Sequence, residues 1–506
     1  MATSVTDLSF EWPAVADTVT STVLSTVPGN VRESYGEQGF DLIVIGGGTA
    51  GIPAAIFAAE RGARVAIIEK APVLGGTLYL SGGLMAAAGT VFQEREGIQD
   101  SADAHYDDIM RISNETSDPV LARLWADLAG PAVNWLAENG FEIRDEHPVT
   151  TTGYDPYSVK RYQSGPEDGV SILKVIMPLL EQHVQEGRVT VLTQADAVEL
   201  KSDADGAVTG VVIEDSNGAR SDMTGSNVLV ATGGCADNDA MFQELHGIPL
   251  YRHAGYPFSQ GDGLSLGVAA GGYLRGADNH VGYYGSVAMD EQIPSELLVT
   301  MSIDPKVRVP WEVFVNLHGE RFLREDHPSV NTRDRIMDSQ PKHRFWAVFD
   351  QRILDEAPPL IPEWSPQQLE DAFNTHPMFA RAESIRELAV ASGIDPDGME
   401  RSIADYNTAI AENTDDLLDR SYRPLPVSTA PFYAIRSQAW TLKSYAGLAV
   451  NENLQVLSKA GEPIGNLYAA GEVLGAATSG KSHTGGGSVT PAVAFGRLLG
   501  ERIIQF

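Results

Sequence analysis

The chain has 506 residues, of which 43% are hydrophobic and 21% charged, ordinary proportions for a soluble globular protein of two or three domains. Its 36 basic and 68 acidic residues give a formal net charge of -32, which argues against nucleic-acid binding because that function needs a basic surface. The single cysteine excludes a disulfide framework and a cysteine-based metal site, and we expect no metal centre.

The N-terminal segment carries no strong pattern. Residues 1–38 are therefore expected to form an arm that packs on the body or stays mobile. The opening stretch, MATSVTDLSFEWPAVADTV, lacks the basic segment and long apolar run of a secretory signal. No apolar run in the chain is long enough for a membrane span. We therefore expect a cytoplasmic protein.

The first regular elements form a strand–helix–strand unit. Residues 40–45 read FDLIVI, which predicts a short buried parallel strand. The glycine turn GGGTAG follows at 46–51, and IPAAIFAAERG predicts a helix rich in small residues that ends at Gly62. ARVAIIEK then predicts a second buried strand ending near Glu69.

Three glycines of this turn have the spacing of a dinucleotide site. Gly46, Gly48 and Gly51 form G-x-G-x-x-G between a strand and a helix. The first glycine permits the tight turn, the second lets the backbone meet a pyrophosphate, and the third lets the helix pack on the strand. Glu69 can accept hydrogen bonds from a ribose 2′-hydroxyl, which favours an adenosine without a 2′-phosphate.

The rest of the chain alternates in character. Residues 101–145 have helical spacing, and residues 189–230 predict a β-meander. Residues 290–430 hold more proline, tryptophan and charge, with VFVNLHGERFL as an expected hairpin and ESIRELAVASG as an expected helix, and we place a second domain there. Strand patterns return from Pro431, and a closing helix is expected over Val489–Ile504.

Three further stretches favour FAD as the dinucleotide. They are GGTLYLSGG at 75–83, VLVATGG at 228–234 and LYAAGE at 467–472. With the glycine turn they resemble the FAD fingerprint of the fumarate reductase and succinate dehydrogenase flavoprotein superfamily, which also holds the 3-ketosteroid dehydrogenases. The resemblance covers roughly residues 40–500.

The resemblance implies an α/β fold with a Rossmann-like FAD-binding domain of the GR2 type and an inserted α+β capping domain. The expected boundaries are 39–285 and 431–506 for the FAD-binding domain and 286–430 for the capping domain. Relatives that bind FAD covalently carry a histidine where this chain has Gly76, so we expect non-covalent FAD. The residues expected to bind it are Gly46, Gly48, Thr49, Ala50, Gly51, Glu69, Lys70, Gly75, Gly76, Thr77, Ser81, Gly82, Gly83, Asp196, Ala231, Thr232, Gly233, Gly471, Glu472, Gly487, Ser488 and Val489.

The resemblance also suggests substrate-site residues. The segment NTRDR at 331–335 matches a T-R-D segment of fumarate reductases, whose arginine donates a proton, and Arg333 stands at that position. Fumarate reductases hold a dicarboxylate with two histidines and an arginine. This chain has Lys443, Ser444 and Tyr445 in the region of one histidine, and Tyr283 near the other, with His280 and Tyr284 close by.

The third difference lies in the final glycine turn. His483 stands where fumarate reductases have their substrate arginine and 3-ketosteroid dehydrogenases a tyrosine that binds the substrate ketone. Losing a bidentate arginine argues against a small dicarboxylate. We expect His483 to donate a hydrogen bond to a carbonyl oxygen and so to stabilise an enolate.

Other residues receive expected roles from their chemistry. Tyr283 or Tyr284 would transfer a proton next to the carbonyl if a neighbour lowers its pKa, and Lys443 would bind a carboxylate or lower that pKa. A structural role stays open for each: backbone satisfaction for His483, core packing for Tyr283, Tyr284 and Tyr445, solvation for Lys443, and an ion pair with Asp334 for Arg333.

These features lead to one favoured hypothesis and two rivals. The favoured one is an FAD-dependent dehydrogenase that desaturates a cyclic or steroid-like ketone. The first rival is a soluble reductase of an unsaturated carboxylate, with Arg333 as proton donor; the second is a flavin-binding protein without turnover. Because the chain lacks C-x-x-C-H and cysteine clusters, an external electron acceptor or donor is expected beside the small-molecule substrate.

Overall fold

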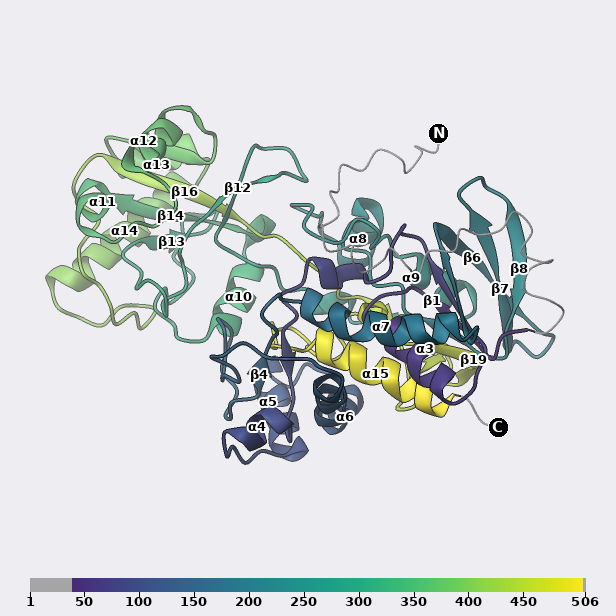
Figure 1. Ribbon diagram of the computed structural model, residues 1–506. Coiled ribbons are helices and arrows are strands. Elements are labelled where there is room, and N and C mark those ends of the chain that lie inside the picture. The colour runs from purple at the N-terminus through teal and green to yellow at the C-terminus, as the bar shows by residue number, and fades with distance from the viewer. Residues whose placement is uncertain (1–38, 504–506) are drawn as a thin grey trace.

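The computed structural model describes residues 39–503. The expected N-terminal arm, residues 1–38, lies outside the described residues. Figure 1 shows two lobes, a larger body that contains both ends of the described chain and a smaller lobe built mostly from the middle of the sequence. In the part of the chain that is described, no helix combines the length and apolarity needed to cross a lipid bilayer.

A six-stranded sheet forms the centre of the body. Of its five parallel strands, β1, β2, β5 and β9 are almost fully buried and β19 is partly buried, and one antiparallel strand, β18, closes an edge. The expected strands FDLIVI and ARVAIIEK are neighbours in it, with Leu42 beside Val65. In spatial order the strands are β18 (Gln455–Leu457), β19 (Pro463–Ala469), β9 (Val228–Val230), β1 (Leu42–Ile45), β2 (Val65–Glu69) and β5 (Val189–Thr193).

Helices cover this sheet, and the first of them is rich in small residues. The expected first helix is α3 (Gly51–Glu60), and it packs against α15 (Val489–Arg502) and α7 (Val170–Gln185). Gly496 and Gly500 of α15 face the backbone of α3, where a Cβ would lie 2.1 Å and 2.5 Å from carbonyl oxygens. The two helices therefore approach more closely than larger side chains would allow.

The expected β-meander is only partly correct. Its middle strands β6 (Ala195–Ser202), β7 (Val208–Asp215) and β8 (Arg220–Thr224) form a separate three-stranded antiparallel sheet. The flanking strands β5 and β9 instead join the parallel sheet. The reason is burial: β5 and β9 are apolar on both faces and suit the centre of an α/β protein, whereas β8 is mostly exposed.

The smaller lobe contains a second sheet, with its own hydrophobic core. Its antiparallel strands are β13 (Val313–Val315), β14 (Arg344–Asp350), β16 (Phe432–Gln438) and β15 (Phe379–Ala382), in that spatial order. The expected hairpin at 313–323 provides only β13, a turn closed by Asn316 and Glu320, and a single bridge; β13 pairs with β14 instead.

The expected domain boundary at 431 differs from the structure. β16 lies after that boundary, yet it pairs with β14 on one side and β15 on the other. Figure 1 shows it as a yellow-green strand inside the mainly green lobe. Ile435 is fully buried in the core of this lobe, so the chain returns to the body only after Gln438.

Five helices surround the second sheet, and short elements link the layers. The helices are α10 (Val330–Asp338), α11 (Gln351–Glu356), α12 (Pro366–Thr375), α13 (Ile385–Ser392), which is the helix expected from ESIRELAVASG, and α14 (Pro396–Ala411). The other elements are η2 (Gly76–Tyr79), β3 (Met85–Ala86), α4 (Val91–Arg95), α5 (Ala102–Ser113), α6 (Pro119–Glu138), β4 (Tyr162–Gln163), α8 (Asp239–His246), α9 (Asp262–Ala269), β10 (Leu274–Arg275), η3 (Ala277–Asn279), β11 (Ser286–Ala288), β12 (Leu297–Thr300), η4 (Pro341–His343), β17 (Gly447–Leu448) and η5 (Glu472–Leu474).

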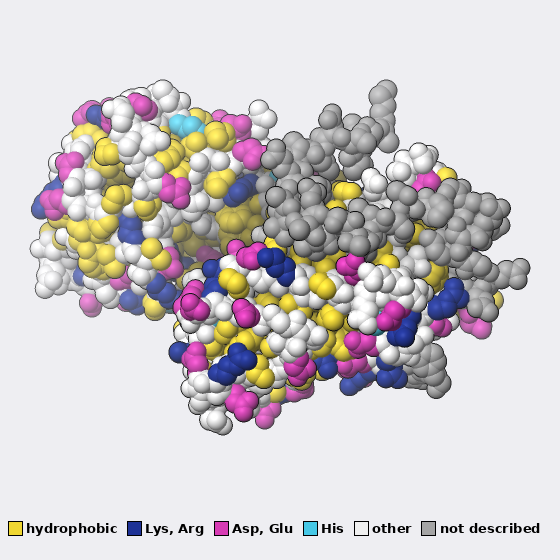
Figure 2. Space-filling view, in the orientation of Figure 1, with side chains coloured by type: hydrophobic (Ala, Val, Ile, Leu, Met, Phe, Trp, Pro, Cys, Tyr) yellow, Lys and Arg dark blue, Asp and Glu magenta, His cyan; other side chains and the backbone are white. Residues whose placement is uncertain are grey.

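The surface carries both signs of charge. On the face shown in Figure 2, lysine and arginine side chains are scattered among acidic ones over both lobes. No broad basic area gathers on that face, in keeping with the acidic composition.

Candidate active site

A cavity of about 370 Å³ lies along the carboxyl ends of the parallel strands. This is where open α/β sheets bind their ligands. Most of the residues expected to bind FAD line it: Gly46, Gly48, Thr49, Ala50, Glu69, Lys70, Gly76, Thr77, Ser81, Gly82, Asp196, Ala231, Thr232, Gly233, Gly471, Glu472, Gly487, Ser488 and Val489. Gly51, Gly75 and Gly83 do not line the cavity.

The glycine turn after β1 forms one wall. Gly46 has a φ of +102°, and a Cβ there would lie 2.4 Å from the carbonyl oxygen of Ala231. A Cβ at Gly48 would meet only the Cα of Gly76, 4.0 Å away, so this backbone faces open space. Gly51 instead touches the carbonyl of Gly46, which lets α3 pack on β1. Each glycine thus occupies the environment that the fingerprint requires.

Acidic and basic side chains line the end of the cavity nearest β2. Glu69 accepts the backbone N–H groups of Gly47 at 2.8 Å and Ala71 at 2.7 Å, so it ties the glycine turn to the end of β2. Burial raises the pKa of Glu69. Lys70 lies 2.9 Å from both Asp196 and Asp262, which joins β2, β6 and α9 around the same opening.

Two helix N-termini point to the cavity without side-chain caps. α3 begins after Ala50 and α15 after Ser488, and neither receives a capping hydrogen bond from a side chain. The N–H groups of Ile52 and Thr490 bond to the carbonyls of Gly48 and Gly486, so among the described residues those of Gly51 and Val489 stay open to an outside acceptor, such as a pyrophosphate or a flavin pyrimidine edge. Thr232 Oγ1 is also buried without a partner among the described residues. These unsatisfied groups fit FAD.

An aromatic cluster forms the other end of the cavity. The ring of Tyr283 stacks on His483, with centroids 4.0 Å apart, and Tyr154 lies 5.6 Å from the same imidazole. Burial raises the pKa of Tyr154 and raises that of Tyr283 well above its ordinary value. Both hydroxyls are therefore protonated at neutral pH.

His483 is held from two sides. Its backbone N–H donates to Asn331 at 2.9 Å, and its Nε2 lies 3.3 Å from the carbonyl oxygen of Gly282. Burial lowers the pKa of His483 to about 3, so the ring is neutral. Because a carbonyl only accepts, Nε2 carries the hydrogen. Nδ1 is buried without a partner in the described chain, so the expected donation of an imidazole N–H to a substrate does not match this tautomer.

Arg333 and Asp334 lie behind this cluster. Asp334 Oδ2 is 3.6 Å from His483 Nε2, and burial raises the pKa of Asp334 to about 8. Arg333 is 2% exposed and donates from Nη2 to the carbonyl of Ile303 at 2.7 Å. It does not line the cavity, and burial lowers its pKa.

The other expected catalytic residues divide into two groups. Lys443 lines the cavity and donates to Ser479 Oγ at 3.1 Å, and burial lowers its pKa. Tyr284 instead donates to Asp338 at 3.2 Å, and Tyr445 donates to the carbonyl of Val281. Neither of these hydroxyls reaches the cavity wall, so the structure brings together only His483, Tyr283 and Lys443 there.

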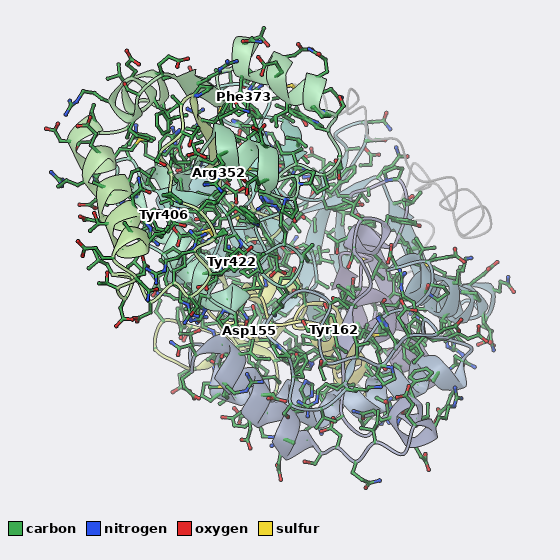
Figure 3. All side chains as sticks on the ribbon, turned by 90° about the vertical axis from the view of Figure 1, so that its left-hand side faces the viewer. Asp155, Tyr162, Arg352, Phe373, Tyr406 and Tyr422 are labelled. Atoms are coloured by element: carbon green, nitrogen blue, oxygen red, sulfur yellow. The ribbon has the colours of Figure 1, made fainter. Side chains whose placement is uncertain are left out.

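Sequence reasoning missed two members of the site. Tyr154 sits in a turn-rich loop, TTGYDPY, that carries no motif. Figure 3 labels Asp155, its neighbour, and Tyr162 near the junction of the lobes, whereas Phe373, Arg352 and Tyr406 belong to the capping lobe. Asp334 belongs to the T-R-D segment, whose pattern suggests only an ion pair with Arg333. Its carboxyl group faces His483 instead.

Comparison with known proteins assigns the family. The model of the FAD binding domain family matches residues 41–489. The chain belongs to this family. It is 29% identical over 476 residues to NADH:fumarate oxidoreductase of Klebsiella pneumoniae (strain 342), covering 92% of this chain but 48% of that protein. The chain thus spans about half the length of this relative.

Other comparisons agree on the fold. Over 474 residues the chain is 27% identical to the probable fumarate reductase Ifc3 of Shewanella frigidimarina (strain NCIMB 400), covering 91% of this chain and 74% of that one. The structure of 3-ketosteroid delta1-dehydrogenase from Sterolibacterium denitrificans matches with a TM-score of 0.69 at 18% identity, over 92% and 99% of the two chains. The expected fold class and FAD cofactor are confirmed, and these similarities support the expected superfamily.

Proposed function

We propose that the protein reduces a carbon–carbon double bond conjugated to a carbonyl group, and that the hydroxyls of Tyr283 and Tyr154 bind the carbonyl oxygen. The observation that carries this proposal is the uncharged cluster of Tyr154, Tyr283 and His483 at the flavin end of the cavity. Hydroxyl donors aimed at a developing oxyanion lower the barrier because they need no reorganisation during the reaction.

The charge of the cavity favours a ketone or similar carbonyl over a dicarboxylate. No arginine is among the described residues that line it. Lys70 is paired with two acids at the end nearest β2, which leaves Lys443 as the cation among the lining residues near the cluster. A dicarboxylate would bring two charges into this buried space and find one cation. Desolvating the second carboxylate without a partner costs several kcal/mol, on the order of the penalty for a buried unpaired ion.

The proton affinities favour reduction over the desaturation expected from the sequence. A base that removes an α-proton works best with a lowered pKa, but burial raises the pKa of both tyrosines. Tyr283 therefore stays protonated and is suited to donate a hydrogen bond to the substrate oxygen, not to take up a proton. His483 supports it by stacking and by its contacts to Gly282 and Asn331, and so acts as a positioning residue.

FAD supplies hydride transfer when it is bound. The N-terminus of α3 with Gly48 would hold its pyrophosphate, and the N-terminus of α15 would hold the flavin ring. Gly76 lines the cavity without a side chain, which supports non-covalent binding. The reducing electrons would come from an external donor, as expected from the sequence.

A second candidate function is reduction of an unsaturated carboxylate with Arg333 as acid. One contact favours it: Asn331 binds the backbone of His483 and so joins the T-R-D segment to the final glycine turn. Burial also lowers the pKa of Arg333, which makes its guanidinium a better acid. This function requires Arg333 to leave the carbonyl of Ile303 and reach the substrate.

Anaerobic stopped-flow spectroscopy of the purified holoenzyme separates these functions. The photoreduced protein is mixed with a cyclic enone, with the matching saturated ketone and with fumarate, and flavin reoxidation is followed near its visible band. The proposal expects reoxidation by the enone. If only fumarate reoxidises the flavin, the Arg333 reaction is favoured. If instead the saturated ketone alone bleaches a sample of the oxidised enzyme, desaturation is favoured. No response to a broad panel of compounds would favour a non-catalytic flavoprotein.

The variant Tyr283→Phe tests the hydroxyl. Loss of this donor is expected to lower kcat for the enone by about 10²-fold while FAD content stays unchanged, as when one oxyanion donor is removed. Tyr468→Phe, in β19 and outside the cavity wall, is the matched control and should keep full activity. A Tyr283→Phe enzyme as fast as the wild type would contradict the proposed role.

A further inference from the structure

Three potential metal-ligating side chains meet where the body joins the capping lobe. His280 follows η3 on the body side, Asp338 ends α10, and His343 ends η4. His280 Nδ1 lies 3.2 Å from Asp338 Oδ1, and His343 Nδ1 lies 3.3 Å from the same oxygen. One ligand atom from each residue lies within 4.8 Å of the other two. Asp338 and His343 are five residues apart, whereas His280 lies 58 residues before Asp338, so the fold brings His280 to the other two.

We propose that His280, Asp338 and His343 bind a divalent transition-metal cation of the Zn²⁺ type. Two imidazole nitrogens with one carboxylate oxygen are a common ligand set for such ions, which magnesium and calcium sites do not use. The two separations from Asp338 Oδ1, 3.2 Å and 3.3 Å, fit as well. Tetrahedral zinc with bonds of about 2.0–2.1 Å places its ligand atoms about 3.3 Å apart, whereas a charge-assisted hydrogen bond is about 2.7–2.9 Å.

Neighbouring groups hold the ligands in orientation. Asp338 Oδ1 accepts the backbone N–H of Gly282 at 2.9 Å and the hydroxyl of Tyr284 at 3.2 Å. The second ring nitrogen of His280, Nε2, lies 3.0 Å from Thr441 Oγ1. Such outer contacts fix which nitrogen of a histidine faces the metal and orient the carboxylate. Tyr284 thus orients the carboxylate of Asp338, a role different from the catalytic one expected from the sequence.

The backbone around His343 is unusual. Lys342 and His343 have φ values of 58° and 50°, two consecutive non-glycine residues in the left-handed region. This conformation is uncommon for residues with a Cβ, and it is concentrated at ligand sites. It also ends η4 so that the His343 side chain lies beside the carboxylate of Asp338.

The cluster is accessible to ions from solution. The side chains of His280, Asp338 and His343 are 8%, 15% and 18% exposed. A small opening of this kind leaves room for water as a fourth ligand, as in zinc sites with three protein ligands. The fully buried ion pair of Arg161 and Asp100, in contrast, offers no such access.

A metal at this position would join the two lobes next to the active site. His280 packs against His246 of α8 and against Tyr445, both in the body. Asp338 belongs to the capping lobe and holds the N–H of Gly282, whose carbonyl receives Nε2 of His483. The metal would therefore stabilise the arrangement of the lobes and the position of His483. Binding of the metal itself does not depend on the proposed reaction.

Calorimetric titration of tag-free holoenzyme with ZnCl₂ tests the site. We expect saturation at one Zn²⁺ per chain, checked by metal analysis after dialysis, and no comparable binding of Mg²⁺. Asp338→Asn, which keeps the shape of the side chain, and His343→Ala should each weaken Zn²⁺ binding at least about tenfold. His318→Ala, an exposed histidine in the same lobe, is the matched control and should bind like the wild type.

Further measurements show whether the variant Asp338→Asn is correctly folded. Circular dichroism and FAD content should match the wild type in Asp338→Asn, and Zn²⁺ should raise the thermal unfolding temperature of the wild type but not of this variant. Failure of the wild type to bind one Zn²⁺ saturably would overturn the proposal. So would unchanged Zn²⁺ affinity in both Asp338→Asn and His343→Ala, or equal affinity for Mg²⁺.

Discussion

The charges of individual residues in the site are set by burial. Asp334 is 7% exposed, and its burial outweighs the nearby positive charge of Arg333 and raises its pKa to about 8. His483 is 4% exposed and stays neutral with a pKa lowered to about 3. At neutral pH the pair is therefore a carboxylic acid beside a neutral imidazole, not an ion pair. A cavity wall without net charge at this point suits an uncharged part of a substrate.

The protonated Asp334 makes stability depend on pH. Between about pH 4 and pH 8 the folded protein keeps a proton on this carboxyl that the unfolded chain has lost, so stability falls as pH rises through this window. Asp334→Asn should flatten that slope by up to about 1.4 kcal/mol per pH unit. Thermal unfolding from pH 5 to pH 8 measures it.

The control for this prediction is Asp405→Asn, which changes an exposed carboxyl group in α14. Its pH profile should follow that of the wild type. A parallel profile for Asp334→Asn and the wild type would show that Asp334 is ionised in the folded protein, and the uncharged description of the site would then be wrong.

At the scale of elements, two helices give the cavity its binding capacity. α3 and α15 pack on each other, and their uncapped N-termini face the same cavity. The helix dipoles add their positive ends to the free N–H groups. The glycines at this turn have two different surroundings: Gly48 faces the cavity, whereas Gly51 packs against the backbone of Gly46. The two surroundings predict different effects of the same substitution.

Gly48→Ala should fold but bind FAD weakly. Its Cβ would have no neighbour closer than 4.0 Å and would project into the cavity, where the crowding costs about 1–3 kcal/mol, equivalent to about ten- to hundredfold weaker binding. Gly51→Ala should instead destabilise the fold, because its Cβ would lie 2.0 Å from the oxygen of Gly46. Titration of the apoprotein with FAD and thermal unfolding distinguish the two variants. Tight FAD binding by a folded Gly48→Ala protein would contradict the ligand-facing role of Gly48.

At the scale of the whole molecule, the described chain forms two separate hydrophobic cores and passes between them twice. The core of the body runs from Phe40 to Leu266 and resumes at Leu448, while the capping core includes Val287 and ends at Ile435. The strand β16 is thus the last element of the capping lobe. The cavity end with His483 and the His280, Asp338 and His343 cluster both lie where these two units meet.

Two cores predict two unfolding transitions. In differential scanning calorimetry, saturating FAD should raise the transition of the body more than that of the capping lobe. Ile435→Ala should destabilise the capping transition by about 2–5 kcal/mol, and Ile43→Ala in β1 should act on the body by a similar amount. If Ile435→Ala lowered only the FAD-sensitive transition, β16 would belong energetically to the body.

Prediction from the sequence succeeded where a feature is local. The turn at Gly46 and the helix that follows depend on neighbouring residues, and the apolar strands β1 and β2 identify themselves by composition. It succeeded less well for β16, whose apolar pattern fits either sheet, so that only its pairing with β14 and β15 assigns it to a lobe.

The sequence by itself determined the FAD-binding half of this protein, because a glycine turn between a strand and a helix carries its conformation and its ligand preference within a few dozen residues. Only the tertiary structure decided the substrate end. Tyr154, Tyr283 and His483 come from three distant segments, and no local pattern links them. Burial then sets their protonation, and burial is a property of the folded chain. For the same reason His280, Asp338 and His343 became a candidate site only once the two lobes were in contact.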